Sequence, residues 1–209
     1  MAHHVFDHPL IQHKLAMLRD PKAPPKLFRE LVYEITLLMA YEATRDLQLI
    51  DGEVCTPMNV TCKTKILPTE TLAVVPILRA GLGMVDAILE LVPQAKVGHL
   101  GLYRDPKTLM PVTYYSKMPE DMNKRNVFIV DPMFATGGSL IATVDNIKEY
   151  KPKSIKSLCI IAAPEAIEKF EKKHPNVPVY CASIDERLNE KGYILPGLGD
   201  AGNRLYGTK

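Results

Sequence analysis

Residues 126–139, NVFIVDPMFATGGS, decide the fold. The first five are apolar and rich in β-branched side chains, which predicts a buried strand of a parallel sheet. Asp131 stands at the carboxyl end of that strand. A glycine pair follows, and apolar residues then recur at helical spacing, which predicts a helix starting near Gly138. Backbone N–H groups, the hydroxyls of Thr136 and Ser139 and the helix N-terminus would all face one point, so we expect an anionic oxygen to bind there.

This loop does not fit a Walker-type nucleoside triphosphatase. That motif needs a lysine after its last glycine, and no lysine lies between Val127 and Ile147. The loop instead carries a carboxylate five residues before T-G-G-S. A carboxylate can accept hydrogen bonds from two sugar hydroxyls while the loop holds a sugar phosphate, as a ribose 5-phosphate ligand requires. An ordinary strand-turn-helix with glycine at the bend is the alternative, and the rest of the chain has to decide.

Composition limits the classes of function. The 209 residues are 46% hydrophobic and 24% charged, as in an ordinary globular protein. The formal net charge is only +2 and no basic block stands out, so neither nucleic acid nor a membrane surface is favoured as a partner. The longest apolar run, residues 72–78, is too short to span a bilayer, and no secretory signal is recognised. We therefore expect a cytoplasmic protein.

Cysteines and histidines do not indicate a metal site. The cysteines share no C-x-x-C spacing, and we expect small buried side chains in a reducing compartment rather than disulfides or zinc ligands. Four histidines cluster near the N-terminus, at an end that we expect to be mobile and that offers no acidic or thiol ligand at a fixed interval. These residues are Cys55, Cys62, Cys159 and Cys181, and His3, His4, His8 and His13.

The N-terminal third is predicted to be a cover or a dimer surface. Helical periodicity runs over residues 9–19 and 24–47, so two helices should precede the first strand. Asp51 and Gly52 predict a turn, and residues 53–67 predict a hairpin or arm.

From residue 72 onward, strands and helices alternate. This pattern predicts a parallel sheet covered on both faces, with ligands bound beyond the carboxyl ends of the strands. The predicted strands are 72–78, 95–103, 126–130, 157–163 and 177–184, and the predicted helices are 82–92, the one from Gly138 to Lys148, and 164–173.

Two arginines follow strands of the predicted sheet. Arg79 begins R-A-G-L-G, which fails as a dinucleotide fingerprint because Asp86 stands where a third glycine or alanine belongs. Arg104 ends the next strand. Each alone could be a surface ion pair, but together with a helix N-terminus they suit a ligand with phosphate at one end and pyrophosphate at the other. Residues 105–119 are either a lid, with 112–115 returning as a hairpin arm, or a surface excursion.

The tail, residues 193–209, reads YILPGLGDAGNRLYGTK. Gly197, Gly199 and Gly202 form a literal G-x-G-x-x-G, but only seven residues follow, too few for the helix and second strand of a dinucleotide site. Such a loop exposes backbone N–H and C=O groups, which can read the acceptor, donor, acceptor edge of a pyrimidine. Cytosine would present the wrong pattern and leave a donor unpaired.

Two motifs together indicate a family. DPMFATGGS resembles the loop with which phosphoribosyltransferases bind phosphoribosyl pyrophosphate (PRPP), and with YILPGLGDAG the pattern resembles the uracil phosphoribosyltransferase family along nearly the whole chain. The resemblance implies the α/β type I phosphoribosyltransferase fold, a parallel sheet flanked by helices with N-terminal helices and a C-terminal base-binding hood. It implies one domain over 1–209, with helices and arm in 1–68, a PRPP-binding core in 69–185 and a uracil-binding hood in 186–209.

The same resemblance implies the reaction and its residues. Uracil and PRPP would give UMP and pyrophosphate, a step of pyrimidine salvage, with Asp200 and Arg104 as catalytic residues. Uracil would contact Ile194, Gly199, Asp200 and Ala201. PRPP would contact Arg79, Arg104, Asp131, Pro132, Met133, Phe134, Ala135, Thr136, Gly137, Gly138, Ser139 and Asp200.

Magnesium would be held mainly by the oxygens of PRPP, because the loop carries a single acid. Homologues suggest a homodimer or higher homo-oligomer, and GTP is a candidate effector. Asn203 departs from the family, where aspartate is common, and Tyr206 replaces a frequent phenylalanine with little expected consequence. Two other readings stay open: a catalytically silent PRPP- or nucleotide-sensing regulator, and a purine or orotate enzyme. Orotate would need a cation beside 194–201, and Arg204 is the candidate.

Overall fold

The computed structural model describes residues 3–104 and 111–208. Its centre is a parallel sheet in the order β1-β11-β10-β8-β4-β5, with β9 also paired to β10. The strands are β1 His3–Val5, β4 Leu72–Pro76, β5 Lys96–Val97, β8 Asn126–Val130, β9 Met133–Phe134, β10 Ser154–Ala162 and β11 Val179–Ile184.

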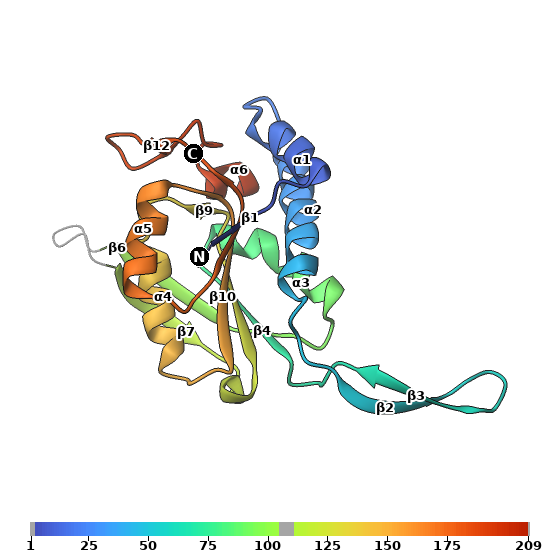
Figure 1. Cartoon of the computed structure of the whole chain (residues 1–209). Helices are drawn as coiled ribbons and strands as arrows, with labels where there is room; N and C mark the ends of the chain where they lie inside the picture. Colours follow the sequence, from blue (N-terminus) through green and yellow to red (C-terminus); the bar gives the residue numbers. More distant parts are fainter. Residues whose placement is uncertain (1–2, 105–110, 209) are drawn as a thin grey trace.

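Helices cover both faces of this sheet, as Figure 1 shows. On one side lie α1 (Pro9–Arg19), α2 (Pro25–Ala43) and α3 (Val85–Leu91), and on the other lie α4 (Gly138–Lys148) and α5 (Pro164–Lys173). The short α6 (Ala201–Tyr206) packs against α2. The 3₁₀ turns are η1 (Ala80–Met84) and η2 (Met122–Lys124). The predicted α/β fold is confirmed.

Apolar periodicity explains the main elements. Phe28, Leu31, Ile35 and Met39 recur on one face of α2 and are fully or almost fully buried. Proline at the first turn of α2 is tolerated because that N–H has no intrahelical partner. All five residues of β4 are buried, as expected for an inner strand covered on both faces.

Three antiparallel pairs stand outside the sheet. They are β2 (Ile50–Cys55) with β3 (Thr61–Ile66), β6 (His99–Arg104) with β7 (Pro111–Lys117), and β12 (Arg187–Leu188) with β13 (Ile194–Leu195). The β2–β3 pair projects from the body as an arm (Figure 1). The predicted hairpin is confirmed, but Asp51 and Gly52 lie within β2. The chain turns instead near Asn59, whose φ is 56°.

Other boundaries differ from the sequence prediction. The helix predicted over 24–47 ends at Ala43, and the one predicted over 82–92 divides into η1 and α3. The strand predicted over 95–103 divides at Gly98: β5 stays in the sheet, whereas β6 leaves to pair with β7. The return of 112–115 as a hairpin arm is confirmed. Residues 105–110 of the expected lid lie outside the described residues.

The N-terminus and two cysteines correct the prediction. His3–Val5 forms β1 on the free edge of β11, so the expectation of a mobile end is wrong for these residues, and a strand precedes the helices. Cys159 and Cys181 are buried as expected, but Cys55 and Cys62 are exposed because the arm has no second layer. Within the described ranges, no helix is long and apolar enough to cross a membrane.

Candidate active site

A pocket of about 320 Å³ opens beyond the carboxyl ends of β4 and β8. Three segments far apart in sequence meet there: the turn after β4, the loop after β8 and the C-terminal tail. The pocket is lined by Ile77, Leu78, Arg79, Ala80, Asp131, Met133, Ala135, Ser139, Gly192, Tyr193, Ile194, Gly199, Asp200, Ala201 and Gly202. Most residues predicted from the two motifs are therefore brought together.

The loop between β8 and α4 forms one wall. Gly137 is the N-cap of α4 with φ 81°, a conformation that favours glycine and that turns the chain into the helix. The first N–H groups of α4 have no partner inside the helix and offer donors to an anion. Behind the loop, a cavity of about 80 Å³ is lined partly by Phe134, Thr136 and Gly137. This wall can therefore accept an anionic group.

Asp131 is at the base of the pocket. Its Oδ1 accepts a hydrogen bond from the N–H of Met133 at 3.2 Å. Burial raises the pKa of Asp131 to about 7, and the Met133 hydrogen bond only partly opposes this. The carboxyl group therefore titrates near neutral pH, and a ligand that donates hydrogen bonds to its charged form would lower its pKa.

The turn after β4 places Arg79, and the peptide bond between Leu78 and Arg79 is cis. A Cβ on Gly81 would lie 2.4 Å from the carbonyl oxygen of Val130, so only glycine lets the turn approach β8 this closely. Arg79 Nη2 donates to Asn203 Oδ1 at 3.3 Å, and the Tyr206 hydroxyl donates to the Arg79 carbonyl at 3.1 Å. Both partners come from the tail, and a phenylalanine at position 206 could not supply the second bond.

The C-terminal segment, described over residues 186–208, forms the opposite wall and is called the hood below. Gly199 has φ 80°, and Asp200 caps α6 by accepting from the N–H of Asn203 at 2.8 Å. Arg204 donates to the backbone carbonyls of Leu18, Asp20 and Leu198 at 2.5–2.8 Å. Its guanidinium group is thus engaged away from the pocket, which argues against a carboxylate-bearing base such as orotate.

The remaining predicted residues lie nearby or cannot be placed. Pro132 is buried beneath the loop. Gly138 lines, together with Thr136 and Ser139, a larger groove of about 1090 Å³ between α4 and α5, whose other lining residues are mostly acidic side chains and lysines of these two helices. Arg104 ends β6, but its side chain lies outside the description. Sequence reasoning missed the structural roles of Asn203 and Tyr206, since nothing in their spacing connects them to Arg79.

The chain offers few metal ligands in this region. Over residues 3–104 and 111–208, no group of three or more histidine, cysteine, aspartate or glutamate side chains could enclose a metal ion. Asp131 and Asp200 do line the same pocket. One or two carboxylates together with substrate phosphates are the usual environment of Mg²⁺, so the site fits an ion that arrives with a phosphorylated ligand.

Comparison with known proteins gives a consistent result. A family model described as "Uracil phosphoribosyltransferase" matches residues 5–208. Proteins of that name from Bacillus pumilus and Geobacillus kaustophilus are each 58% identical over 206 residues, covering 99% of this chain and 98% of the relative. The one from Dictyoglomus thermophilum is 58% identical over 205 residues.

Solved structures agree on the fold. The AQ2163 protein from Aquifex aeolicus has a TM-score of 0.92 at 41% identity, covering 98% of this chain and 97% of that one. A hypoxanthine-guanine phosphoribosyltransferase from Bacillus anthracis has a TM-score of 0.53 at 13% identity, covering 77% and 82%. The second likeness concerns the fold alone.

Proposed function

The chain belongs to the uracil phosphoribosyltransferase family, and from this premise we propose how its residues transfer the 5-phosphoribosyl group of PRPP to N1 of uracil. The products are UMP and pyrophosphate. The observation that carries the proposal is the pocket in which the turn after β4, the loop after β8 and the hood converge. PRPP and uracil together present a sugar phosphate, a pyrophosphate and a planar base, and each of the three segments would bind one of these groups.

Residues 131–139 bind the ribose 5-phosphate part of PRPP. Support comes from the left-handed Gly137, which turns the chain into α4, whose first N–H groups have no partner within the helix. Thr136 and Ser139 add hydroxyl groups. Asp131 accepts hydrogen bonds from the ribose hydroxyls, and these bonds favour its charged form.

The pyrophosphate end of PRPP binds Arg79 and Arg104. Arg79 lines the pocket; Asn203 accepts a hydrogen bond from its guanidinium group, and Tyr206 donates to its backbone carbonyl. Arg104 is assigned from its position at the end of β6. A Mg²⁺ ion, held mainly by the oxygens of PRPP, would supply further positive charge there. Departure of pyrophosphate builds negative charge, which the two arginines stabilise.

Uracil is read by the main chain of the hood. Ile194, Gly199 and Ala201 line the pocket and offer backbone donors and acceptors, and Tyr193 lies beside them. These groups match the acceptor, donor, acceptor edge of uracil, whereas the amino group of cytosine would face a backbone donor. Asp200, between the base and PRPP, assists loss of the N1 proton or steadies the ribosyl cation.

A single assay tests the function. Purified protein is mixed with PRPP, Mg²⁺ and one of three bases, uracil, hypoxanthine or orotate, and the nucleotide and pyrophosphate are quantified. We expect UMP from uracil and at most traces of product from the other two. PRPP binding without any turnover would instead support the silent regulator, and preferential use of hypoxanthine or orotate would support another base specificity.

Self-association and regulation stay predictions. The β2–β3 arm exposes apolar side chains, including Val54, Met58 and Val60, and has no second layer to cover them. We propose that a second copy of the chain covers them in a homodimer or higher oligomer, which sedimentation equilibrium would detect. GTP as an effector would be detected as a change in turnover on its addition, and cytoplasmic location by cell fractionation.

A further inference from the structure

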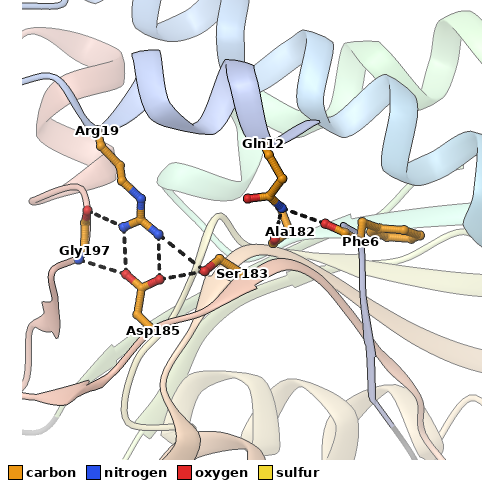
Figure 2. A network of polar contacts seen from close by, with 7 residues as sticks. All are labelled: Phe6, Gln12, Arg19, Ala182, Ser183, Asp185 and Gly197. Atoms are coloured by element: carbon orange, nitrogen blue, oxygen red, sulfur yellow. Dashed lines mark hydrogen bonds and ion pairs between the residues drawn. The ribbon is translucent and has the colours of Figure 1, made fainter. Parts of the chain in front are cut away.

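The ion pair between Arg19 and the buried carboxylate of Asp185 contacts the hood through the backbone of a single residue, as Figure 2 shows. The N–H of Gly197 donates to Asp185 Oδ2 at 2.9 Å, and the Gly197 carbonyl accepts from Arg19 Nη1 at 2.7 Å. Gly197 lies between Ile194 and Gly199, both of which line the pocket. The position of these two pocket residues therefore depends on how Gly197 is held.

The ion pair itself is well defined. Arg19 donates to both carboxylate oxygens of Asp185, at 2.7 and 2.6 Å, and the Ser183 hydroxyl donates to Asp185 Oδ1 at 2.8 Å. Asp185 is only 6% exposed. Burial alone would raise its pKa, but hydrogen bonds from Arg19, Ser183 and Gly197 outweigh burial and hold the pKa below its ordinary value. The carboxylate is therefore charged when it binds Gly197.

The two partners come from rigid elements. Arg19 ends α1, and Asp185 follows β11 of the central sheet. Gln12 lies in the first turn of α1, at the other end of the helix from Arg19. Its Nε2 donates to the carbonyls of Phe6 and Ala182 at 2.7 and 2.9 Å, which fixes α1 against β11 (Figure 2). Because α1 and β11 are fixed relative to each other, Arg19 and Asp185 offer the hood a stationary support.

We infer that Arg19 and Asp185 are positioning residues for the uracil site. Neither lines the 320 Å³ pocket. They act through Gly197, setting where the main-chain groups of Ile194 and Gly199 meet the base. The inference rests on the proposed role of the hood in binding uracil. It identifies the two side chains that fix the position of the uracil-binding main-chain groups.

A general stabilising role is the competing explanation, and the chain contains a matched control for it. Arg125 pairs with Asp121 at 2.7 Å, is 2% exposed and also donates to the carbonyls of Thr69 and Leu72. Arg125, which is more deeply buried than Arg19, lies next to the amino end of β8, remote from the pocket. Its loss should lower stability without altering how uracil binds.

The test compares Asp185→Asn, Arg19→Lys and Arg125→Gln in the full-length enzyme. Asparagine would place an amide donor against either Arg19 or the N–H of Gly197, and lysine cannot reach both carboxylate oxygens and the Gly197 carbonyl with one planar group. For both Asp185→Asn and Arg19→Lys we expect KM for uracil to rise about 10-fold or more. KM for PRPP and kcat at saturating uracil should change by less than about 3-fold.

The outcomes are distinct. Arg125→Gln should lower Tm while leaving KM for uracil within about 2-fold of the parent enzyme. If Asp185→Asn and Arg19→Lys lower Tm but leave KM for uracil unchanged, the inference is overturned. If Asp185→Asn does not fold, Arg19→Lys alone decides by the same criterion. If the parent enzyme makes no UMP, the proposed function fails instead, which is a separate result.

Discussion

The two walls of the pocket are built in different ways. The phosphate wall, residues 131–139, is one short segment between a buried strand and a helix, and its geometry follows from those two neighbours. The hood has only two-residue strands and a six-residue helix of its own. It is held by contacts with the far end of the chain: Arg19 donates to the Gly197 carbonyl, and Arg204 of the hood donates to the Leu18 carbonyl.

This difference has a functional consequence. The loop of the phosphate wall should keep its conformation when distant residues are substituted, because the strand and the helix on either side of it pack in the core. A loop held by distant side chains is only as well placed as those contacts. We therefore expect base binding to be more sensitive than phosphate binding to equivalent substitutions.

The largest expected effect comes from Gly197 in the hood, and Gly137 in the phosphate wall is its counterpart. Gly137 and Gly197 both have positive φ, 81° and 66°, so alanine is strained at either. At Gly137 the nearest atom to a Cβ, the carbonyl oxygen of Ala166, would be 3.5 Å away, whereas at Gly197 the carbonyl oxygen of Ile194 would be 2.1 Å away. We expect Gly197→Ala to lower kcat/KM for uracil more than about 100-fold, and Gly137→Ala less than about 10-fold.

Steady-state kinetics with both substrates would measure this difference. Gly207→Ala is the control for backbone strain, because φ is 65° there and a Cβ would lie 3.8 Å from its nearest neighbour, Pro25. Its effect on kcat/KM should be small. Equal losses in Gly137→Ala and Gly197→Ala would remove the distinction between the two walls.

Asp200→Asn tests whether the hood carries chemistry as well as recognition. Asparagine can also cap α6, so the fold of the hood should be preserved. We expect kcat to fall about 100-fold while the Kd for PRPP, measured by calorimetry, changes by less than about 3-fold. Comparable losses in turnover and PRPP affinity would instead make Asp200 a binding residue.

The same contrast explains what the sequence could predict. The strand at 126–130 and the helix at 138–148 have the predicted bounds, because apolar periodicity and the glycine pair are properties of adjacent residues. The two motifs also identified most of the residues that line the pocket. Their roles toward PRPP and uracil remain predictions.

Long-range contacts were beyond sequence reasoning. Arg19 and Asp185 are 166 positions apart, and nothing in the composition around either residue indicates the other. The edge strand His3–Val5 has no apolar pattern and exists because β11 offers an unpaired edge and Tyr180 a ring on which His4 stacks. Cys55 and Cys62 lie in strands, as the sequence predicts, but both are exposed. Burial of a strand residue depends on whether a second layer covers its sheet, and the local sequence does not reveal this.

Arg104→Ala tests whether the phosphate wall and Arg79 suffice to hold PRPP. A charge-assisted contact to a phosphate contributes about 1.5–3 kcal/mol, so its loss should weaken PRPP binding about 10-fold to 100-fold. Calorimetry with PRPP and Mg²⁺ measures this, and Arg45→Ala, an exposed arginine on the surface of the body, removes the same charge as a control. Unchanged affinity in Arg104→Ala would remove this residue from the site.

The smallest expected effect on ligand binding is a pH dependence that belongs to the phosphate wall alone. Because the pKa of Asp131 is about 7, the carboxylate that the ribose hydroxyls need is mostly ionised at pH 8 and mostly protonated at pH 6. PRPP affinity should therefore fall by up to about 10-fold between these values. Asp131→Asn should bind more weakly throughout and keep only the pH dependence of PRPP itself. A profile identical in both proteins would contradict the assignment.

The same shift predicts the opposite effect on the ligand-free fold. The folded pKa of about 7 lies above the ordinary value of 3.8, so the unfolded chain holds fewer protons between these values and stability is lost as pH rises through that window. Asp131→Asn has no charge to bury and should raise the free energy of unfolding by about 2–4 kcal/mol at pH 8, a gain that shrinks toward pH 4. Urea unfolding at both pH values would measure it. A variant that binds PRPP less well yet unfolds less readily would show that Asp131 is retained for the ligand at the expense of the fold. Asp185, which supports the hood, carries no such conflict, because hydrogen bonds from Arg19, Ser183 and Gly197 stabilise its charged form.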